Sequence, residues 1–365
     1  MSEFDPEGFK ILALVTDGVG ARGGIARYNQ DVFQAWESCS EISQNYVVAL
    51  GGDTSHQSER LVQRAYKSRI GFVLRGLWWS ITSKPDIVFC GHINLVLFSY
   101  CLARITGARF WVQVHGVEAW SRPSRLVRIV CARADLISSV SRYTKNEISR
   151  WLAPQTAKSV VISNTFSAPK PLGRDSRLTP KLKETLEGKK VLLSIGRLDR
   201  REQYKGHDRV IRVMRELSRV LEDEVVYVIC GDGDDLSRLR NLARECLVED
   251  KCIFTGYLDD DARNALIEVA DLFVLPSTGE GFGIVYLEAL SRGLPVLGFS
   301  GCGSSDPLQD GNYGKLSSPD RLLQDIKELL LTAKTIPLQN LSASFGFPAF
   351  CRRVQHSTRA LLKGV

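Results

Sequence analysis

The sequence predicts an α/β protein made of two Rossmann-like, doubly wound domains that face each other across a cleft. Short apolar runs alternate with longer segments of helical periodicity along nearly the whole chain, which is typical of parallel sheets with right-handed crossovers. The alternation breaks once, where closely spaced prolines follow Ser167, and such a break indicates a linker. A chain of 365 residues is long enough for two separate cores.

The apolar runs and the prolines set the expected elements and boundaries. An N-terminal domain is expected over residues 1–167, a linker over 168–188, a C-terminal domain over 189–342 and a helical tail over 343–365, with Pro348 in the first turn of the tail helix. The expected strands are 11–15, 46–50, 86–90, 110–114, 136–140 and 160–162 in the first domain, and 191–195, 225–230, 252–255, 272–275 and 295–298 in the second.

Composition predicts a cytoplasmic protein that is not integral to a membrane. Hydrophobic residues make up 44% and charged residues 24% of the chain, as in ordinary globular proteins. The nine cysteines include no Cys-x-x-Cys pair, so we interpret them as reduced side chains, most of them buried. The N-terminus lacks a signal-peptide pattern. One uncharged run, residues 87–103, contains Gly91, His92 and Asn94, which favours a strand, a turn and a helix over a membrane span.

Positive charge is concentrated in the first half of the chain. Residues 60–150 hold 15 basic and 4 acidic side chains, and residues 66–79 interleave basic with large apolar side chains, including Trp78 and Trp79. This pattern favours peripheral association with an anionic membrane face. The alternative is a solvated helix face with the tryptophans in the core. Nucleic acid is not an expected partner, because no binding motif accompanies the charge.

The most informative motif is Gly279-Glu280-Gly281-Phe282-Gly283, which lies between an expected strand and an expected helix. Glu280 is placed in the loop, and Glu288 about two helical turns beyond it. Backbone N–H groups at the start of a helix suit hydroxyl oxygens or an anion, and two carboxylates facing one ligand can each hold a pair of hydroxyls. The motif therefore indicates a sugar ligand, against the alternative of an ordinary corner with two solvated glutamates.

Two cations follow the first expected strand of the second domain. Arg197 comes directly after that strand, and Lys205 precedes the next helix. Beside a ligand cleft they suit a diphosphate, because Arg binds phosphate in a bidentate manner and Lys acts as a point charge. The alternative is a pair of surface charges, but their position on a strand-to-helix loop favours a function.

Other candidate sites carry weaker signals. A glycine-rich loop over residues 16–27 leads into a helix and can approach a phosphate, although its spacing matches neither dinucleotide nor Walker fingerprints. His115 follows an expected strand and is expected to face the cleft. The Gly231-Asp232-Gly233-Asp234-Asp235 segment is expected to form a turn and helix cap. The run Asp259-Asp260-Asp261 resembles a metal cluster, but a helix N-terminus explains it more simply.

Taken together and in order, these motifs resemble the retaining, nucleotide-sugar-dependent glycosyltransferases of the GT-B fold, specifically glycosyltransferase family 4. The resemblance spans nearly the whole chain and is strongest over residues 191–311. The matching elements are Gly23-Gly24-Ile25-Ala26-Arg27, His115-Gly116-Val117-Glu118, Ile162-Ser163-Asn164, Gly196-Arg197-Leu198, Lys205-Gly206-His207, Gly231-Asp232-Gly233 and the pair Glu280 and Glu288.

The resemblance implies a role for each matched residue. Arg197 and Lys205 would hold the diphosphate and stabilise the leaving nucleotide, Glu288 would bind the ribose, and Glu280 would hold the donor sugar. The implied catalytic residues are Arg197, Lys205, Glu280 and His115, with His115 near the sugar ring from the opposite domain. The implied nucleotide-sugar-binding residues are Gly24, which lets its loop approach the phosphates, Arg197, Lys205, Gly231, Tyr257 and Leu258 near the base, Glu280, Gly281, Phe282, Gly283, Ile284 and Glu288.

The resemblance also implies a metal-independent enzyme without a cofactor, since two cations take the place of a divalent ion. It implies no protein nucleophile, because the family retains anomeric configuration through front-face attack. The tail helix is expected to pack back on the N-terminal domain. One departure is the segment 301–307, where the family's Gly-Gly-x-Pro-Glu glutamate is missing and Asp306 stands nearby.

The predicted function is transfer of a hexosyl group, with mannose from GDP-mannose as the first choice, to a glycan acceptor that is lipid-linked. The expected setting is cell-envelope or exopolysaccharide synthesis. UDP-glucose, UDP-galactose or a UDP-amino sugar are alternative donors. Two other classes stay open, a dinucleotide-dependent oxidoreductase and a non-catalytic sugar-binding protein; the first lacks its glycine fingerprint here, and the second would not require both Arg197 and Lys205.

Overall fold

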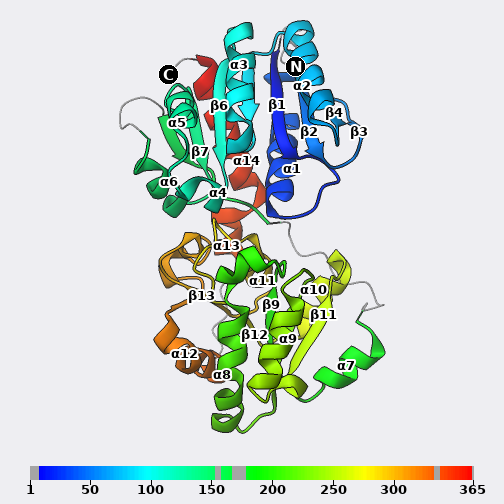
Figure 1. The fold of residues 1–365 in the computed structure, drawn as a ribbon, viewed down its shortest axis with the longest axis vertical. Coiled ribbons are helices and arrows are strands. Elements are labelled where there is room, and N and C mark those ends of the chain that lie inside the picture. Colours follow the sequence, from blue (N-terminus) through cyan, green and yellow to red (C-terminus); the bar gives the residue numbers. More distant parts are fainter. Residues whose placement is uncertain (1–7, 153–157, 167–177, 333–337, 364–365) are drawn as a thin grey trace. The chain divides into compact units, whose positions relative to one another are not determined.

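The computed structural model describes residues 8–152, 158–166, 178–332 and 338–363. Contacts divide the chain into two compact units, Met1–Thr165 with Phe347–Val365 (unit 1) and Phe166–Gly346 (unit 2). Each unit contains one twisted sheet covered by helices (Figure 1). Of the segment expected to be a linker, residues 168–177 lie outside the described part, and α7 (Pro180–Leu186) follows. Thr179 caps this helix and Pro180 stands in its first turn, so the last part of that segment is helical.

Unit 1 is built on an eight-stranded sheet with the order β3-β4-β2-β1-β5-β6-β7-β8. Leu14 of the central strand β1 lies opposite Val48 of β2 on one side and Cys90 of β5 on the other. Neighbouring strands are parallel except β3 with β4. The strands are β1 (Phe9–Asp17), β2 (Ile42–Gly51), β3 (Ser55–Gln57), β4 (Leu61–Ala65), β5 (Ile87–Cys90), β6 (Arg109–Val114), β7 (Leu136–Ser139) and β8 (Lys158–Val161).

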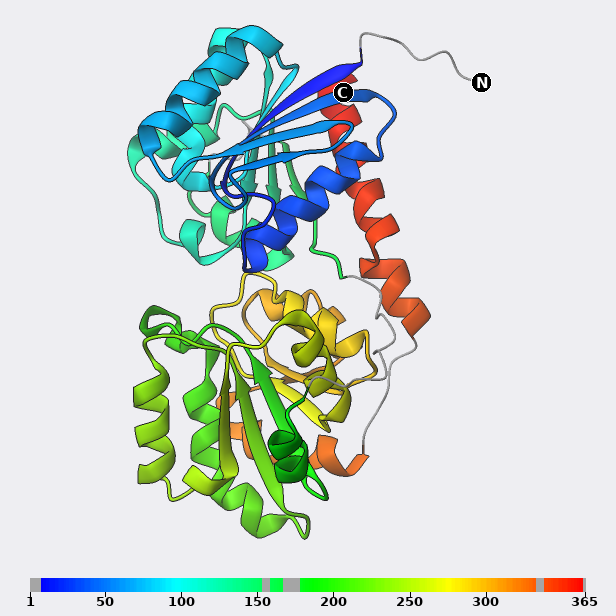
Figure 2. The same ribbon diagram turned by 90° about the vertical axis from the view of Figure 1, so that its right-hand side faces the viewer.

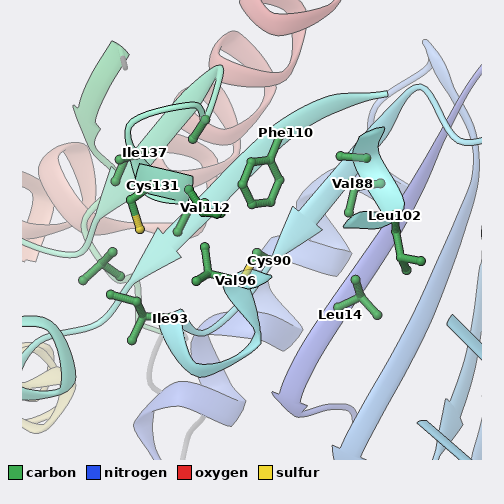
Figure 3. Packing of buried hydrophobic residues seen from close by; sticks show 14 of the residues in the cluster. Leu14, Val88, Cys90, Ile93, Val96, Leu102, Phe110, Val112, Cys131 and Ile137 are labelled. Atoms are coloured by element: carbon green, nitrogen blue, oxygen red, sulfur yellow. The ribbon is translucent and has the colours of Figure 1, made fainter. Parts of the chain in front are cut away.

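One face of this sheet packs against three helices that lie next to one another, α2, α3 and α5. Strand residues such as Val88 and Val112 meet Leu102 of α3 and Cys131 of α5 in a continuous apolar core (Figure 3). Every second side chain of the buried parallel strands points to this face and meets the apolar stripes of the covering helices, which closes the core. The helices of unit 1 are α1 (Gly24–Glu37), α2 (Arg69–Ser83), α3 (Val96–Thr106), α4 (Val117–Trp120), α5 (Arg125–Cys131), α6 (Arg142–Ser149) and α14 (Phe347–Lys363).

The C-terminal helix α14 packs against α1 within unit 1, as Figure 2 shows. Trp36 Nε1 donates to Thr358 Oγ1 over 3.1 Å, and the rings of Tyr28 and Phe350 make an edge-to-face contact with centroids 5.6 Å apart. α14 begins at Phe347, which places Pro348 in its first turn, where a proline costs no hydrogen bond.

Unit 2 has a fully parallel six-stranded sheet with the order β11-β10-β9-β12-β13-β14. The chain moves outward from β9 in one direction and from β12 in the other, so the topological switch point lies between these two strands. The strands are β9 (Lys190–Ile195), β10 (Val225–Cys230), β11 (Cys252–Gly256), β12 (Leu272–Leu275), β13 (Val296–Phe299) and β14 (Lys315–Ser317). The remaining helices are α8 (His207–Val220), α9 (Leu236–Glu245), α10 (Asp260–Val269), α11 (Ile284–Leu290), α12 (Leu322–Thr332) and α13 (Leu338–Phe345).

The two doubly wound sheets confirm the predicted α/β class. The expected strands are all present, whereas the short strands β3, β4 and β14 were not expected. Each of these three lies at or next to the edge of its sheet, where strands are short and need no long apolar run. In the part of the chain that the structure describes, no helix is both long enough and apolar enough to cross a bilayer.

Candidate functional site

The switch point of unit 2 gathers most of the residues expected to bind a ligand. Arg197 follows the end of β9 by two residues, and Glu280 lies in the loop between β12 and α11. Because parallel strands end at the same edge of a sheet, the loops after β9 and β12 meet there. Lys205 ends a 3₁₀ turn, Arg200–Lys205, which brings the chain from β9 to α8.

Four side chains join in a charged cluster at this edge. Lys205 Nζ lies 3.0 Å from Glu280 Oε1 and 3.7 Å from Glu202 Oε2, and Arg197 Nη2 lies 3.5 Å from Glu202 Oε1. Burial alone would lower the pKa of Lys205, but Glu280 and Glu202 raise it above its usual value, so the ammonium is charged. Arg197 points further into solvent, with its side chain 66% exposed. The cluster thus presents one shielded and one accessible cation.

The backbone around the cluster is tightly packed, and this fixes the position of Lys205. Gly206 adopts φ +80°, and a Cβ there would lie 2.4 Å from the carbonyl oxygen of Pro276. The ring of Tyr204 lies against Gly279, where an added Cβ would come within 2.5 Å of the ring. Thr278 N donates to the Tyr204 carbonyl oxygen over 2.9 Å. The loops after β9 and β12 are therefore held together by close backbone contact that only glycine permits.

The turn before α11 forms as the motif predicted. Gly283 caps the helix with φ +88°, a conformation that favours glycine. Tyr286 donates from its hydroxyl to the Leu275 carbonyl oxygen over 2.7 Å, which ties the helix to the end of β12. Phe282 is buried, and its ring packs against Phe345 with centroids 5.8 Å apart. Its side chain is thus part of the core, and only its backbone is suited to the binding role expected of it.

The loop after β13 completes this turn although the family's glutamate is missing. Gly303 N donates to the Glu280 carbonyl oxygen over 2.8 Å, and a Cβ on Gly303 would lie 2.1 Å from the carbonyl oxygen of Gly281. Cys302 Sγ donates to the Ser277 carbonyl oxygen over 3.3 Å. The segment that departs from the family pattern therefore supports the Glu280 turn through backbone contacts.

Glu288 lies on α11 and pairs with a cation that the sequence did not single out. Its Oε1 atom is 3.3 Å from Arg263 Nη2, on α10. Its Oε2 atom is buried and has no hydrogen-bond partner among the described residues. A buried carboxylate oxygen normally has a partner, so this atom is a ready acceptor for a ligand hydroxyl.

The loops after β10 and β11 border the same edge of the sheet. A Cβ on Gly231 would lie only 1.8 Å from the Gly196 carbonyl oxygen, and Gly231 N donates to the Gly256 carbonyl oxygen over 3.0 Å. Tyr257, which follows β11, is exposed, and Leu258 is half-buried. Ile284, the first residue of α11, is also half-buried.

Two predicted site residues belong to unit 1, beyond its strands β1 and β6. Gly24 is the first residue of α1 and is exposed. Its loop is held by the buried amide of Gln63, which accepts from Val19 N over 2.7 Å and donates to the carbonyl oxygens of Val19 and Asp53. Gln63 was not predictable from the sequence, since a glutamine in a strand carries no motif.

His115 follows β6 and packs among aromatic and backbone groups of unit 1. Its Nε2 atom lies 2.9 Å from the Gly91 carbonyl oxygen, and its ring meets that of Tyr28 edge to face. Glu118 accepts from His115 N over 2.6 Å, which fixes the turn. Burial lowers the pKa of His115, with Glu118 acting in the opposite direction, so the ring is neutral at neutral pH. Its role toward a donor sugar stays a prediction.

The structure decides the alternatives for two other motifs. Asp259 Oδ1 accepts from Ala262 N over 2.8 Å and Asp260 pairs with Arg263, so the aspartate run forms a helix N-terminus as the simpler interpretation predicted. A Cβ on Gly233 would lie 2.1 Å from the Leu198 carbonyl oxygen, and Asp232 Oδ1 accepts a hydrogen bond from Gly233 N, as expected for a turn.

Among the charged residues of unit 2, sequence reasoning missed Glu202 and Arg263. Glu202 precedes Lys205 by three residues, a spacing that pairs side chains on a helical turn, and this signal was available. Arg263 is 25 positions from its partner Glu288, and nothing in the sequence links them. A cavity of about 190 Å³ lies elsewhere, at the amino ends of β6, β7 and β8, and none of the predicted site residues lines it.

The fold and the site together define a class of protein. Two Rossmann-like units, with cations and carboxylates at the switch point of the second, are the architecture of a GT-B glycosyltransferase. Residues 22–167 match the family model Glycosyltransferase Family 4, and residues 178–342 match the model Glycosyl transferases group 1. The chain belongs to this glycosyltransferase family, which confirms the resemblance that its motifs indicated.

Curated relatives share moderate identity over part of their length. A GDP-mannose-dependent alpha-(1-6)-phosphatidylinositol monomannoside mannosyltransferase of Mycolicibacterium smegmatis is 31% identical over 58% of this chain and 58% of its own. An N-acetyl-alpha-D-glucosaminyl L-malate synthase of Bacillus anthracis is 26% identical over 60% of this chain and 57% of its own. The matched region thus spans less than three fifths of the length of each of these two relatives.

Solved structures share the fold over nearly the whole chain. Anabaena HepE in complex with UDP-glucose superposes with a TM-score of 0.74 at 18% identity, over 96% of this chain and 99% of its own. Sucrose-phosphate synthase of Thermosynechococcus elongatus superposes with a TM-score of 0.76 at 18% identity, over 98% of this chain and all of its own. At this identity the likeness establishes the fold.

Proposed function

We propose that this protein is a retaining glycosyltransferase that moves a hexosyl group from a nucleotide sugar to a glycan acceptor. The observation that carries the proposal is the cluster of Arg197, Lys205, Glu202 and Glu280 at the switch point of unit 2. This is the place where doubly wound sheets bind nucleotides. The cluster combines what the reaction needs, cations for a diphosphate and a carboxylate for sugar hydroxyls.

The reaction develops negative charge on the departing diphosphate and positive charge on the sugar. Arg197 and Lys205 stabilise the departing phosphate without reorganising, since contacts with Glu202 and Glu280 already hold them in place. One such preorganised group contributes roughly 3–4 kcal/mol to lowering the barrier. We propose that these two cations replace a divalent metal, and we assign no protein nucleophile.

The two glutamates divide the sugars of the donor between them. Glu280 accepts hydrogen bonds from hydroxyls of the transferred hexose, next to the backbone of Gly281 and Gly283. Glu288 accepts hydrogen bonds from the ribose hydroxyls at Oε2, the oxygen that has no hydrogen-bond partner among the described residues. Arg263 holds the other oxygen and thereby orients the carboxylate. Tyr257 and Leu258, after β11, are the candidates for contact with the base.

We propose GDP-mannose as the donor and a lipid-linked glycan as the acceptor, in cell-envelope or exopolysaccharide synthesis. The support is the 31% identity to a mannosyltransferase whose name specifies GDP-mannose and a phosphatidylinositol mannoside. A UDP-sugar is the alternative donor, because Anabaena HepE, which shares the fold, is solved with UDP-glucose. A different sugar is named for a 2-deoxystreptamine N-acetyl-D-glucosaminyltransferase of Streptomyces fradiae, which is 26% identical. An acceptor of this kind places the enzyme at the surface of a membrane.

A panel of donors tests the proposal. The purified chain is incubated with GDP-mannose, UDP-glucose, UDP-galactose and UDP-N-acetylglucosamine, and release of the nucleoside diphosphate is measured with and without EDTA. We expect turnover of one donor, unaffected by EDTA, with the anomeric configuration of the product retained. Turnover that EDTA abolishes and a divalent ion restores would contradict the assignment of the phosphate site.

Variants of the two cations test the site itself. Arg197→Ala and Lys205→Ala are each expected to lower kcat by about 100-fold or more, because each removes a group that stabilises the departing phosphate. Arg219→Ala, which removes an exposed cation of α8 that pairs with Glu216, is the matched control and is expected to keep full activity. Unchanged transfer by the Arg197→Ala, Lys205→Ala double variant would show that the site lies elsewhere.

A further inference from the structure

Helix α2 exposes an apolar stripe instead of burying it. Ile70, Leu74 and Trp78 are 72%, 61% and 53% exposed, and their spacing of four residues places them on one side of the helix. The buried side of the same helix holds Phe72, Gly76, Trp79 and two serines. The outward face of α2 thus carries large apolar side chains where an ordinary surface helix carries polar ones.

The neighbouring helices extend this apolar surface. α2 packs on α3, where Phe98 lies against Gly76, and α3 packs on α5. These three helices have only 15, 11 and 7 residues, yet they carry nine of the seventeen large apolar side chains that are exposed among the described residues. The nine are Ile70, Val73, Leu74, Trp78, Ile81, Leu97, Ile105, Leu126 and Ile129. So dense a cluster on adjacent elements marks a contact surface.

The charges around the stripe have one sign. α2, α3 and α5 contain five arginines and no acidic residue, and exposed Lys67 and Lys84 flank α2 at its two ends. The four carboxylates within residues 60–150 lie outside these helices and bind groups of the sheet and its loops. Asp86 accepts a hydrogen bond from Lys10 N, Glu118 from His115 N and Asp135 from Phe110 N, and Glu147 forms an ion pair with Arg150.

We propose that the outer face of α2, with the adjoining parts of α3 and α5, docks on an anionic lipid bilayer. Charge complementarity selects this partner, because arginines around an apolar stripe match acidic headgroups above an acyl layer. The apolar side chains enter the boundary between headgroups and chains, and the arginine and lysine stems reach the phosphates. This surface is made of residues other than those of the cluster at Lys205. Its use to bring the enzyme to a lipid-linked acceptor rests on the proposed function.

Trp78 and Arg75 form the centre of the docking face. The Arg75 guanidinium carbon lies 4.9 Å from the ring centroid of Trp78 and 5.2 Å from that of Trp79. Arg75 Nε also donates to the Tyr66 hydroxyl over 2.9 Å. Trp79 is buried in the core and Trp78 is exposed, so one ring anchors the helix and the other is available at an interface, where tryptophan is favoured.

Vesicle binding tests the proposal without any donor or acceptor, so that its failure is separate from a failure of the proposed reaction. The full chain is sedimented with vesicles of phosphatidylcholine alone or mixed with phosphatidylglycerol, at low and high salt. We expect binding to the anionic vesicles that weakens as salt is raised. The variant Ile70→Ser, Leu74→Ser, Trp78→Ser is expected to bind at least tenfold more weakly, and each of Lys67→Gln and Arg69→Gln about fivefold more weakly.

A matched control replaces three exposed apolar residues of unit 2, Val269→Ser, Leu331→Ser and Leu338→Ser, and is expected to bind like the wild type. Quenching of Trp fluorescence by acyl-chain-brominated lipid, lost in Trp78→Phe, would support insertion. Absence of binding at low salt, or equal binding by the α2 triple variant, would overturn the proposal. So would a wild-type dimer in sedimentation that this variant converts to a monomer, because the face would then bind a second copy.

Discussion

The ion pair of Lys205 and Glu280 is expected to stabilise unit 2 as well as to prepare it for a diphosphate. The two side chains are only 15% and 12% exposed, with Nζ and Oε1 3.0 Å apart. Removing one partner of a largely buried pair leaves a buried charge without compensation, which costs about 3–5 kcal/mol. The perturbation that tests this is a double-mutant cycle of Lys205→Met and Glu280→Gln.

The structure predicts that the two single variants differ. Lys205→Met leaves Glu202 and Glu280 without their shared cation, so the destabilisation should lie near the upper part of that range, about 4–5 kcal/mol. Glu280→Gln leaves Lys205 with Glu202 at 3.7 Å and with an amide oxygen that can accept a hydrogen bond from its ammonium, so about 1–3 kcal/mol is expected. The double variant should be less destabilised than the sum, by about 1–3 kcal/mol of coupling.

The chain offers a way to assign the unfolding transition to its unit. All six tryptophans lie within residues 36–151 of unit 1, so Trp fluorescence reports unit 1, whereas far-UV circular dichroism reports both units. Urea unfolding of each variant is followed by both signals. The dichroism transition is expected to shift to lower urea while the fluorescence transition shifts less.

An exposed pair of the same unit supplies the control. Arg219 and Glu216 lie 3.5 Å apart with side chains 62% and 51% exposed, and Arg219→Met with Glu216→Gln is expected to change stability by less than about 1 kcal/mol. If the Lys205 cycle gave effects as small as this control, or if its two single effects simply added, the buried-pair reasoning would be refuted.

Three further changes have definite expected outcomes. Glu202→Gln removes the carboxylate that holds Arg197 and Lys205 in place, so calorimetric titration should show GDP or UDP binding about fivefold more weakly; tighter binding would mean that Glu202 competes with a bound diphosphate instead. Gly231→Ala should cost at least about 2 kcal/mol in urea unfolding because its Cβ meets a carbonyl oxygen at 1.8 Å, whereas Gly188→Ala, with φ +73° and no atom within 4 Å, should cost about 1 kcal/mol. Burial lowers the pKa of His207 from 6.5 to about 3, so between these values the unfolded state binds a proton that the folded state does not bind. The contribution of His207 to the free energy of unfolding is therefore complete above pH 6.5 and falls as the pH drops toward 3. The dependence of the free energy of unfolding on pH should be weaker in His207→Gln, and an unchanged dependence would count against this reasoning.

The candidate site could be predicted wherever its residues follow strands. Strands of a parallel sheet end at one edge, so placing Arg197 after β9 and Glu280 after β12 was enough to expect them near each other. The pairing of Glu288 with Arg263 was not predictable, because it depends on how α10 and α11 pack. Phe282 was expected to offer its backbone to the ligand, and the position of its ring on Phe345 was not predictable, since the direction of a side chain in a glycine-rich turn follows from dihedral angles that the sequence leaves open.

The amino-acid order by itself determined the α/β class, the two domains and the family, because period and motif spacing are local properties of the chain. It also established that Trp78 and Trp79 lie in a basic, apolar segment, but not which of them faces outward. Only the tertiary structure decided that Trp79 enters the core while Ile70, Leu74 and Trp78 stay exposed. The physical reason is that a helix with apolar residues on every side has no intrinsic inner face, and the sheet and neighbouring helix against which it packs select one.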